Sequence, residues 1–173
     1  MLQNTPERFA AQLQEGHYNE LRVALWFMLR GAHVRLGYTG QRYDLSVILD
    51  QGETFSVEVK WDKAAAATGN LYFETENTRQ HAPSGVAATT AAWWCHVVGE
   101  GSEALIARLE TLRALVASGS FRTVQTRGDD SNSRGVLVPR AHLDTVRCGR
   151  WIRLPTEAEF FGELFRGQAI GRR

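Results

Sequence analysis

The chain has 173 residues, 43% of them hydrophobic and 23% charged, and a formal net charge of +1. These values are ordinary for a globular protein, and the length favours one domain with a well-formed core. No stretch approaches the length of a membrane span, the polar N-terminus lacks a signal core, and two cysteines are too few for a disulfide scaffold or a cysteine-built zinc site, so we expect a cytoplasmic protein.

The predicted elements begin with a helix, because apolar residues recur at helical spacing over 17–31 and Gly31 supplies a stop. Strand patterns follow, and the turn at 50–53 joins two of them as a hairpin. The predicted strands cover 32–38, 43–49, 54–61, 70–76, 92–98, 121–126, 135–140 and 150–154, and further helices cover 83–91, 101–118 and 156–167. This order of elements predicts an α/β (α+β) fold with a mixed sheet flanked by helices.

The strand over 54–61 places Glu58 and Lys60 on one face, because successive side chains of a strand alternate. The two side chains then stand roughly 7 Å apart along the strand and can flank one reacting centre. Lys60 and Lys63 are the only lysines in a chain whose other basic residues are arginines. Lysine is a compact charge whose pKa can move, whereas guanidinium is always protonated. The alternative is a half-buried strand with a solvated charged face.

A second carboxylate is expected beside this pair. Asp44 begins the strand before the hairpin, so pairing of the two strands brings it next to Glu58 and Lys60. Two converging carboxylates form a hard oxygen site suited to Mg²⁺ or Mn²⁺. Such a cation can orient a phosphate, acidify a water and stabilise the charge that develops in phosphodiester cleavage. The alternative for Asp44 is a turn-capping aspartate at the start of a strand.

Asp44, a gap, and then Glu58-Val59-Lys60 resembles the PD-(D/E)xK nuclease superfamily, in which Asp, Glu and Lys lie on adjacent strands. The resemblance implies a restriction-endonuclease-like core and a metal-dependent endonuclease. It assigns the cation to Asp44, Glu58 and the carbonyl of Val59, and the positioning or activation of water to Lys60. It also implies a helper acid on the first helix, where Glu20 stands; a helix residue that faces water or pairs with a nearby arginine is the alternative. Tyr43 departs from the proline of the motif.

The stretch from Asn70 to Trp94 is similar to small phage and prokaryotic nucleases of this superfamily, among them the Holliday-junction resolvases. That resemblance implies a compact homodimer, because paired cuts in a two-fold junction need two active sites. Helices over 101–118 and 156–167 are candidate interface elements. Ser84 and Thr89 are expected to donate to a DNA phosphate near a helix N-terminus, with helix capping as the alternative.

Positive charge is concentrated late in the chain. Residues 119–153 carry seven arginines against three aspartates, the footprint of a polyanion-binding face if the arginines gather in space. Arg134, Arg140, Arg147 and Arg150 are the candidate DNA contacts, and a partnerless arginine-rich surface is the alternative. Trp93 and Trp94 alternate across a strand, so one belongs in the core and the other is a candidate base-stacking residue.

Taken together, the sequence predicts one nuclease-like domain over 1–173, with a core at about 17–118 and a basic elaboration at about 119–173. The predicted function is Mg²⁺- or Mn²⁺-dependent endonucleolytic cleavage of DNA, including branched or four-way-junction DNA, by a prokaryotic or phage-like homodimer without membrane contact. Two alternatives stay open: a restriction or repair nuclease of the same superfamily, and a nucleic-acid-binding protein with this fold that does not cleave.

Overall fold

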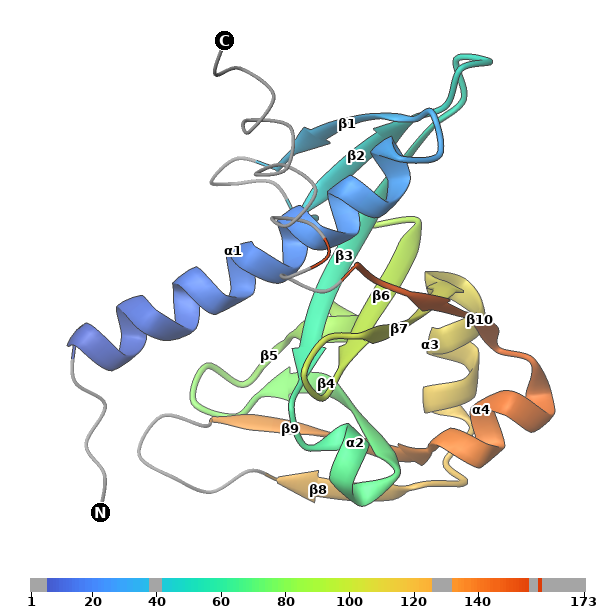
Figure 1. Ribbon diagram of the computed structural model, residues 1–173. Helices are drawn as coiled ribbons and strands as arrows, with labels where there is room; N and C mark the ends of the chain where they lie inside the picture. The colour runs from blue at the N-terminus through green and yellow to red at the C-terminus, as the bar shows by residue number, and fades with distance from the viewer. Residues whose placement is uncertain (1–5, 38–41, 126–131, 156–158, 160–173) are drawn as a thin grey trace, which may run out of the picture.

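Two β-sheets form the centre of the computed structural model, which describes residues 6–37, 42–125, 132–155 and 159. The larger sheet has six strands in the order β1-β2-β3-β6-β7-β10 (Figure 1). Its strands are β1 (His33–Leu36), β2 (Leu45–Ile48), β3 (Thr54–Asp62), β6 (Trp93–Val98), β7 (Glu103–Arg108) and β10 (Gly149–Arg153). Strands β3 and β6 run parallel and the other neighbours run antiparallel, so the sheet is mixed.

The smaller sheet has four strands in the order β5-β4-β9-β8, all antiparallel. Its strands are β4 (Asn70–Asn77), β5 (Ala82–Pro83), β8 (Arg122–Gln125) and β9 (Ser133–Pro139). The pairing of β4 with β9 shifts register between Glu74 and Glu76. This sheet packs against one face of the larger sheet, which we call the inner face.

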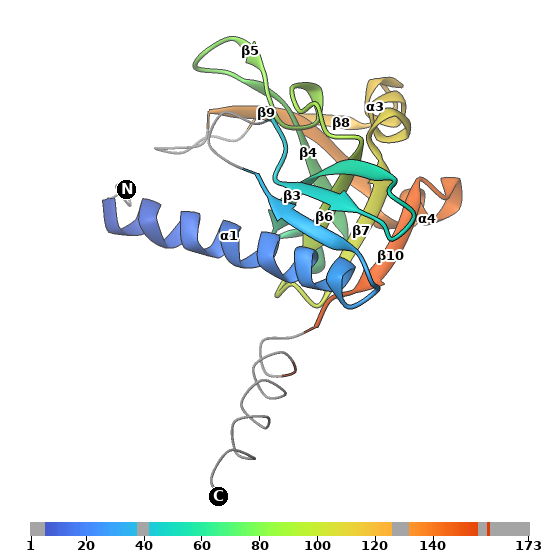
Figure 2. The same cartoon turned by 90° about the horizontal axis from the view of Figure 1, so that it is seen from above.

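Helix α1 (Pro6–Met28) covers part of the opposite face of the larger sheet, which we call the α1 face (Figures 1 and 2). Its buried side chains Val23 and Phe27 belong to the same core as Leu45, Val57 and other apolar residues of that face. The remaining helices are α2 (Ala65–Thr68), the 3₁₀ helix η1 (Gly85–Ala87), α3 (Leu109–Ala117) and α4 (Arg140–Val146). Within the described residues, no helix is long and apolar enough to cross a membrane.

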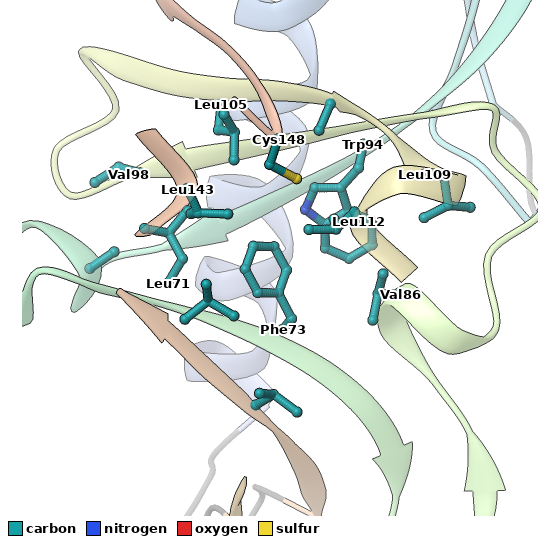
Figure 3. Close-up of a cluster of buried hydrophobic side chains, with 14 residues drawn as sticks. Leu71, Phe73, Val86, Trp94, Val98, Leu105, Leu109, Leu112, Leu143 and Cys148 are labelled. Atoms are coloured by element: carbon teal, nitrogen blue, oxygen red, sulfur yellow. The ribbon is translucent and has the colours of Figure 1, made fainter. Parts of the chain in front are cut away.

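A second core fills the space between the two sheets. Phe73 of β4 faces Trp94 of β6 with ring centroids 6.2 Å apart, and Leu112 of α3 and Leu143 of α4 close around them (Figure 3). Trp94 is fully buried, whereas Trp93 points to the α1 face and is only partly buried. The alternation of the two tryptophans therefore places one of them in the core, as the sequence predicts.

The predicted mixed sheet flanked by helices is confirmed, but the helix over 101–118 is wrong in its first half. Residues 103–108 form β7, between β6 and β10, and α3 begins only at Leu109. Leu105 packs into the core between the sheets and Ala104 into the core under α1. A strand buried on both faces reads as a continuous apolar run, which periodicity does not distinguish from a helix. Only α3 therefore remains of that predicted interface helix.

The helix predicted over 83–91 is reduced to the single turn of η1, and α4 forms where no helix was predicted. The helix predicted over 156–167 lies outside the described residues, apart from residue 159. The described part of the basic C-terminal region belongs to both sheets, because β9 pairs with β4 and β10 pairs with β7. Arg22 of α1 also donates two hydrogen bonds to the Pro155 carbonyl, at 3.0 and 2.8 Å.

Candidate metal-binding and catalytic site

Asp44 lies at the point where strand β2 stops pairing with β3. The last paired residues are Leu45 and Val57, so β3 has no strand neighbour on that side from Glu58 onward. The Asp44 carboxylate takes the place of the missing strand, because its Oδ2 accepts the Val59 N–H at 2.7 Å. The Asp44 N–H donates to the Val57 carbonyl at 3.0 Å and fixes the turn into β2. Backbone pairing thus brings Asp44 to β3, as the hairpin predicts.

Glu58 and Lys60 share the inner face of β3, as the alternation predicts. Lys60 Nζ lies 2.6 Å from Glu58 Oε1. The Thr89 hydroxyl lies 2.9 Å from Glu58 Oε2 and 2.7 Å from the Arg42 carbonyl, so its one hydrogen can serve either acceptor. Glu58 is only 8% exposed. The solvated charged face that was the alternative for this strand is therefore wrong for Glu58.

The charges of this group are strongly coupled. Burial, and next the neighbouring charge of Glu58, raises the pKa of Asp44 to about 6, against the Val59 N–H and Lys60, which lower it. For Lys60, burial alone would lower the pKa, but the Glu58 carboxylate, helped by Asp44 and Glu74, raises it above the ordinary lysine value. Asp44 is therefore harder to ionise than an ordinary aspartate, and Lys60 is a protonated ammonium in the metal-free site.

Asp44 and Glu58 line one cavity of about 630 Å³, together with residues of the 42–43 segment, β5 and the η1 region. Lys60 lines a neighbouring cavity of about 480 Å³, with Asp62, Tyr72 and other residues of β3, β4 and β6. The Glu58–Lys60 ion pair therefore lies at the boundary between the two cavities. A substrate in the first cavity would contact the carboxylates of Asp44 and Glu58, with the Lys60 ammonium on the side of the second cavity.

The donor set fits a hard divalent cation. Within the described residues, no cluster of three or more His, Cys, Asp or Glu side chains is arranged to hold a metal. Mg²⁺ does not require such a cluster, because it usually binds through one or two carboxylates and keeps waters or substrate phosphates as its other ligands. Asp44 and Glu58 offer those carboxylates, and burial together with the Glu58 charge raises the pKa of Asp44, an effect that a bound cation would oppose. The Val59 carbonyl as a third ligand stays a prediction.

Glu20 of α1 also contributes to this field. Its charge is one of the causes that raise the pKa of Asp44, so the helix acid stands near the pair. Its Oε2 lies 3.2 Å from Nδ1 of the exposed His17, one turn earlier on the helix. This neighbour is a histidine and not the arginine of the alternative, and the catalytic role of Glu20 stays a prediction.

The two predicted phosphate donors both contact carboxylates. The Ser84 hydroxyl donates to Glu74 Oε1 at 2.5 Å and makes no capping hydrogen bond to η1. Thr89 faces Glu58 instead of solvent, and it is buried. Arg113 of α3 holds this loop by donating to the carbonyls of Val86 and Thr89, at 2.8 and 2.6 Å. Thr89 therefore positions Glu58, and its contact with phosphate stays a prediction.

The four predicted DNA-binding arginines do not gather around the carboxylates. Arg134 of β9 pairs with Glu76 at 2.8 Å, and Arg140 of α4 pairs with Glu103 at 2.8 Å. Arg147 and Arg150 line a groove on the α1 face, the opposite side of the larger sheet from Glu58. The arginines thus lie in three separate places.

Sequence reasoning missed two features of the site. Arg42 lines the cavity beside Asp44 and was not marked by any spacing rule, and Tyr43, which stands in place of the proline of the motif, lines it as well. Asp62, two residues after Lys60 on the same strand face, accepts the Tyr72 N–H at 2.9 Å and lies 3.4 Å from His96 Nε2. The shared face of Glu58, Lys60 and Asp62 was the signal available for Asp62. Its buried partner His96 could only be found from the parallel pairing of β3 with β6.

No protein-family model matches the chain, and no curated protein matches it. A solved structure of a bacterial homing endonuclease is similar over 91% of this chain and 95% of its own length, with 15% sequence identity and a TM-score of 0.48. At that TM-score the likeness carries no argument. The function must therefore be argued from the geometry of the site.

Proposed function

We propose that the protein is a metal-dependent endodeoxyribonuclease that hydrolyses phosphodiester bonds at Asp44, Glu58 and Lys60. The observation that carries the proposal is the convergence of two carboxylates, from β3 and from the turn before β2, on one cavity beside an ammonium. Burial raises the pKa of Asp44 to about 6, a carboxylate stress that a bound cation would relieve.

Each side chain has a distinct task in this proposal. Mg²⁺ or Mn²⁺, when bound, supplies an acidified water and neutralises phosphate charge. Asp44 and Glu58 hold the cation, with the Val59 carbonyl as the proposed third ligand and Glu20 as a helper from α1. The Glu58 carboxylate raises the pKa of Lys60 in the metal-free site. Lys60 positions or activates the attacking water, beside the scissile phosphate.

The proposed substrate is DNA with a branched or four-way-junction structure, and the proposed assembly is a homodimer. Support comes from the similarity of the 70–94 stretch to compact resolvases and from the two-fold symmetry of such junctions. A restriction or repair nuclease is the rival within the same chemistry. Mapping of the cuts on linear, flap and four-way-junction DNA separates these substrates, and sedimentation of the protein tests the dimer.

One observation favours a protein that binds DNA without cutting it. Glu58 already has Lys60 and Thr89 at its two oxygens, so its charge is partly satisfied by the protein itself. If this ion pair persists with the cation present, Glu58 is not a ligand. Calorimetric titration of Mg²⁺ or Mn²⁺ into the parent and into Asp44→Asn and Glu58→Gln distinguishes the cases. If both carboxylates hold the cation, the heat of cation binding is lost in both variants.

The decisive test of the function compares the two lysines of the chain. Lys60→Ala should abolish Mg²⁺-dependent cleavage of branched DNA while leaving DNA binding largely intact. Lys63→Ala is the matched control, since Lys63 follows closely in the sequence but its Nζ lies over the Trp61 ring, 4.2 Å from the centroid. Equal cleavage by both variants would remove Lys60 from the mechanism. No cleavage by the parent of any DNA, with either metal, would leave the non-cleaving protein.

A further inference from the structure

A groove of about 410 Å³ lies on the α1 face of the larger sheet, between α1 and strands β3, β6, β7 and β10. Its volume is within the range of small-ligand sites, roughly 300–1,000 Å³. Trp26 of α1, Phe55 of β3 and Trp93 of β6 supply its aromatic walls. Arg108 at the end of β7, Arg147 after α4, and Arg150 of β10 supply its charge. Nothing in the proposed cleavage mechanism uses these residues.

The aromatic side chains form a continuous series of ring contacts. Phe27 lies 5.1 Å from Trp26 and 5.8 Å from Phe55, and Phe55 lies 6.0 Å from Trp93, all measured between ring centroids. The guanidinium of Arg108 stands over the Trp93 ring at 4.8 Å. Trp93 is only partly buried. A flat ligand entering the groove would therefore meet aromatic surface and a stacked guanidinium together.

The charge of the groove selects the kind of ligand. Its described lining includes three arginines and no Asp or Glu, and all three arginines are exposed. Arg134 and Arg140, by contrast, are each paired with a glutamate. Aromatic surface with unopposed guanidinium groups at its rim is complementary to a flat ring attached to phosphates, and it is poorly suited to an uncharged apolar peptide.

The buried indole N–H of Trp26 adds a second observation. Among the described residues, its Nε1 is the one buried side-chain nitrogen or oxygen without a hydrogen-bond partner. Buried polar groups are normally paired, and an unpaired one calls for an explanation. Nucleobases carry carbonyl oxygens and ring nitrogens, which are the kind of acceptor that this donor lacks in the structure.

We infer that the groove binds an unpaired base of a DNA strand, stacked against Trp93, with the flanking phosphates on Arg108 and Arg150. The inference rests on the proposed function in taking DNA as the partner, but it uses the opposite face of the sheet. The groove and the carboxylates lie on opposite faces of the sheet, with β3 as an inner strand. The inference therefore concerns the binding of unpaired bases and gives the groove no part in the cleavage step.

The test measures binding without metal, in EDTA, so that it is independent of cleavage. The probes are a short fluorescent single-stranded oligodeoxynucleotide and its abasic counterpart, which has the same phosphates and no bases. Arg108→Ala with Arg150→Ala should weaken binding of both probes about tenfold and flatten the slope of log K against log salt by roughly 1.4, the value for two lost phosphate contacts on a single strand. Arg79→Ala with Arg122→Ala, two exposed arginines in and beside the smaller sheet, is the matched control.

Trp93 separates stacking from charge. Trp93→Leu should weaken binding of the base-containing probe at least about fivefold and leave the abasic probe unchanged, while Trp93→Phe keeps most of the affinity because it keeps a ring. Circular dichroism and thermal unfolding verify that each variant folds. If Trp93→Leu does not fold, the double arginine variant and Trp93→Phe carry the test.

Three results would overturn the inference. The first is equal affinity of the groove and control arginine variants. The second is a Trp93→Leu variant that loses equal affinity for both probes, or a Trp93→Phe variant that no longer prefers the base-containing probe. Either result would leave only a phosphate-binding surface. The third is concentration-dependent self-association that disappears in the groove variants, which would make the groove an interface between two copies of the chain. Cleavage that persists in all of these cases would leave the proposed function standing.

Discussion

Asp44 and Asp62 flank Lys60 from two sides, yet their environments are opposite. Burial, and next the charge of Glu58, raises the pKa of Asp44 to about 6, although the Val59 N–H and the charge of Lys60 act to lower it. Burial acts on Asp62 in the same direction, but the hydrogen bonds from His96 and from the Tyr72 and Ala65 N–H groups overcome it and lower its pKa. Asp44 accepts one backbone N–H, whereas Asp62 has four hydrogen-bond partners: the N–H groups of Ala64, Ala65 and Tyr72, and the His96 ring.

The difference separates a chemical role from a structural one. Asp62 Oδ1 accepts the N–H groups of Ala64 and Ala65 at 3.1 and 3.0 Å, so it begins α2 as well as bonding β4. Trp94 Nε1 donates to His96 Nδ1 at 3.2 Å, which leaves His96 Nε2 to carry the hydrogen toward Asp62. A carboxylate that accepts this many hydrogen bonds has few lone pairs available to bind a cation. Asp44 accepts fewer hydrogen bonds and lines an open cavity, so it can bind one.

The largest expected effect is the loss of cleavage when either proposed metal ligand, Asp44 or Glu58, is replaced. Glu58→Gln and Asp44→Asn keep the size of each side chain and remove its charge, so cation binding and phosphate hydrolysis should both be lost. We expect cleavage rates to fall by at least about 100-fold, the scale of losing one main electrostatic group of an active site. Single-turnover cleavage with saturating Mg²⁺ measures the loss. Asp62→Asn is the control, and a comparable loss there would erase the contrast between the two aspartates.

The next largest effect is expected on the free energy of unfolding, when Asp62 is replaced. Asp62→Ala removes the acceptor of three backbone N–H groups and the partner of buried His96. Breaking such a buried polar network should lower the free energy of unfolding by about 3 kcal/mol. Urea denaturation at neutral pH measures the change. A variant as stable as the parent would mean that water or other groups replace the lost acceptor.

A smaller effect, of opposite sign in the two aspartates, should appear in the pH dependence of unfolding. The pKa of Asp44 is raised from 3.8 to about 6, so its favourable contribution is present below pH 3.8 and is lost as the pH rises to about 6. The pKa of Asp62 is lowered, so its contribution is present above pH 3.8 and is lost as the pH falls below that value. Asp44→Asn should therefore stabilise the metal-free protein at pH 7 by about 1 kcal/mol, discounted for partial exposure, and have no such effect near pH 4. Thermal unfolding in EDTA at the two pH values checks the sign, and equal shifts at both would contradict it.

An effect on stability of similar size is expected at Thr89, the residue that orients Glu58. Thr89→Val keeps the shape of the side chain and removes the hydroxyl near Glu58, the Arg42 carbonyl and the Ala91 N–H. We expect the free energy of unfolding to fall by about 1 kcal/mol and cleavage to slow modestly. Thr89→Ser retains the hydroxyl and is the matched control. If the serine variant slows cleavage as much as the valine variant does, the methyl packing of Thr89 matters more than its hydrogen bond to Glu58.

Local pattern was sufficient for β3 and misleading for β7. The alternation of Glu58 and Lys60 follows from the geometry of one strand, and the hairpin at 50–53 brings Asp44 alongside, so these features were predictable. Residues 103–108 were misread because Leu105 and Ala104 are buried in two different cores, which the sequence pattern cannot show. The arginines at 134 and 140 were predicted as a common face, but their glutamate partners lie far away in the sequence.

By itself, the sequence determined which side chains share a face of β3 and that an aspartate stands near them, because alternation and hairpin pairing are local properties of the chain. Only the tertiary structure decided which carboxylate accepts a single backbone N–H and which accepts several donors. The donors that saturate Asp62 come from α2, β4 and β6, whereas β2 ends before it can cover the edge of β3 beside Glu58. Hydrogen-bond satisfaction depends on groups from distant elements, so the difference between these two aspartates arises only on folding.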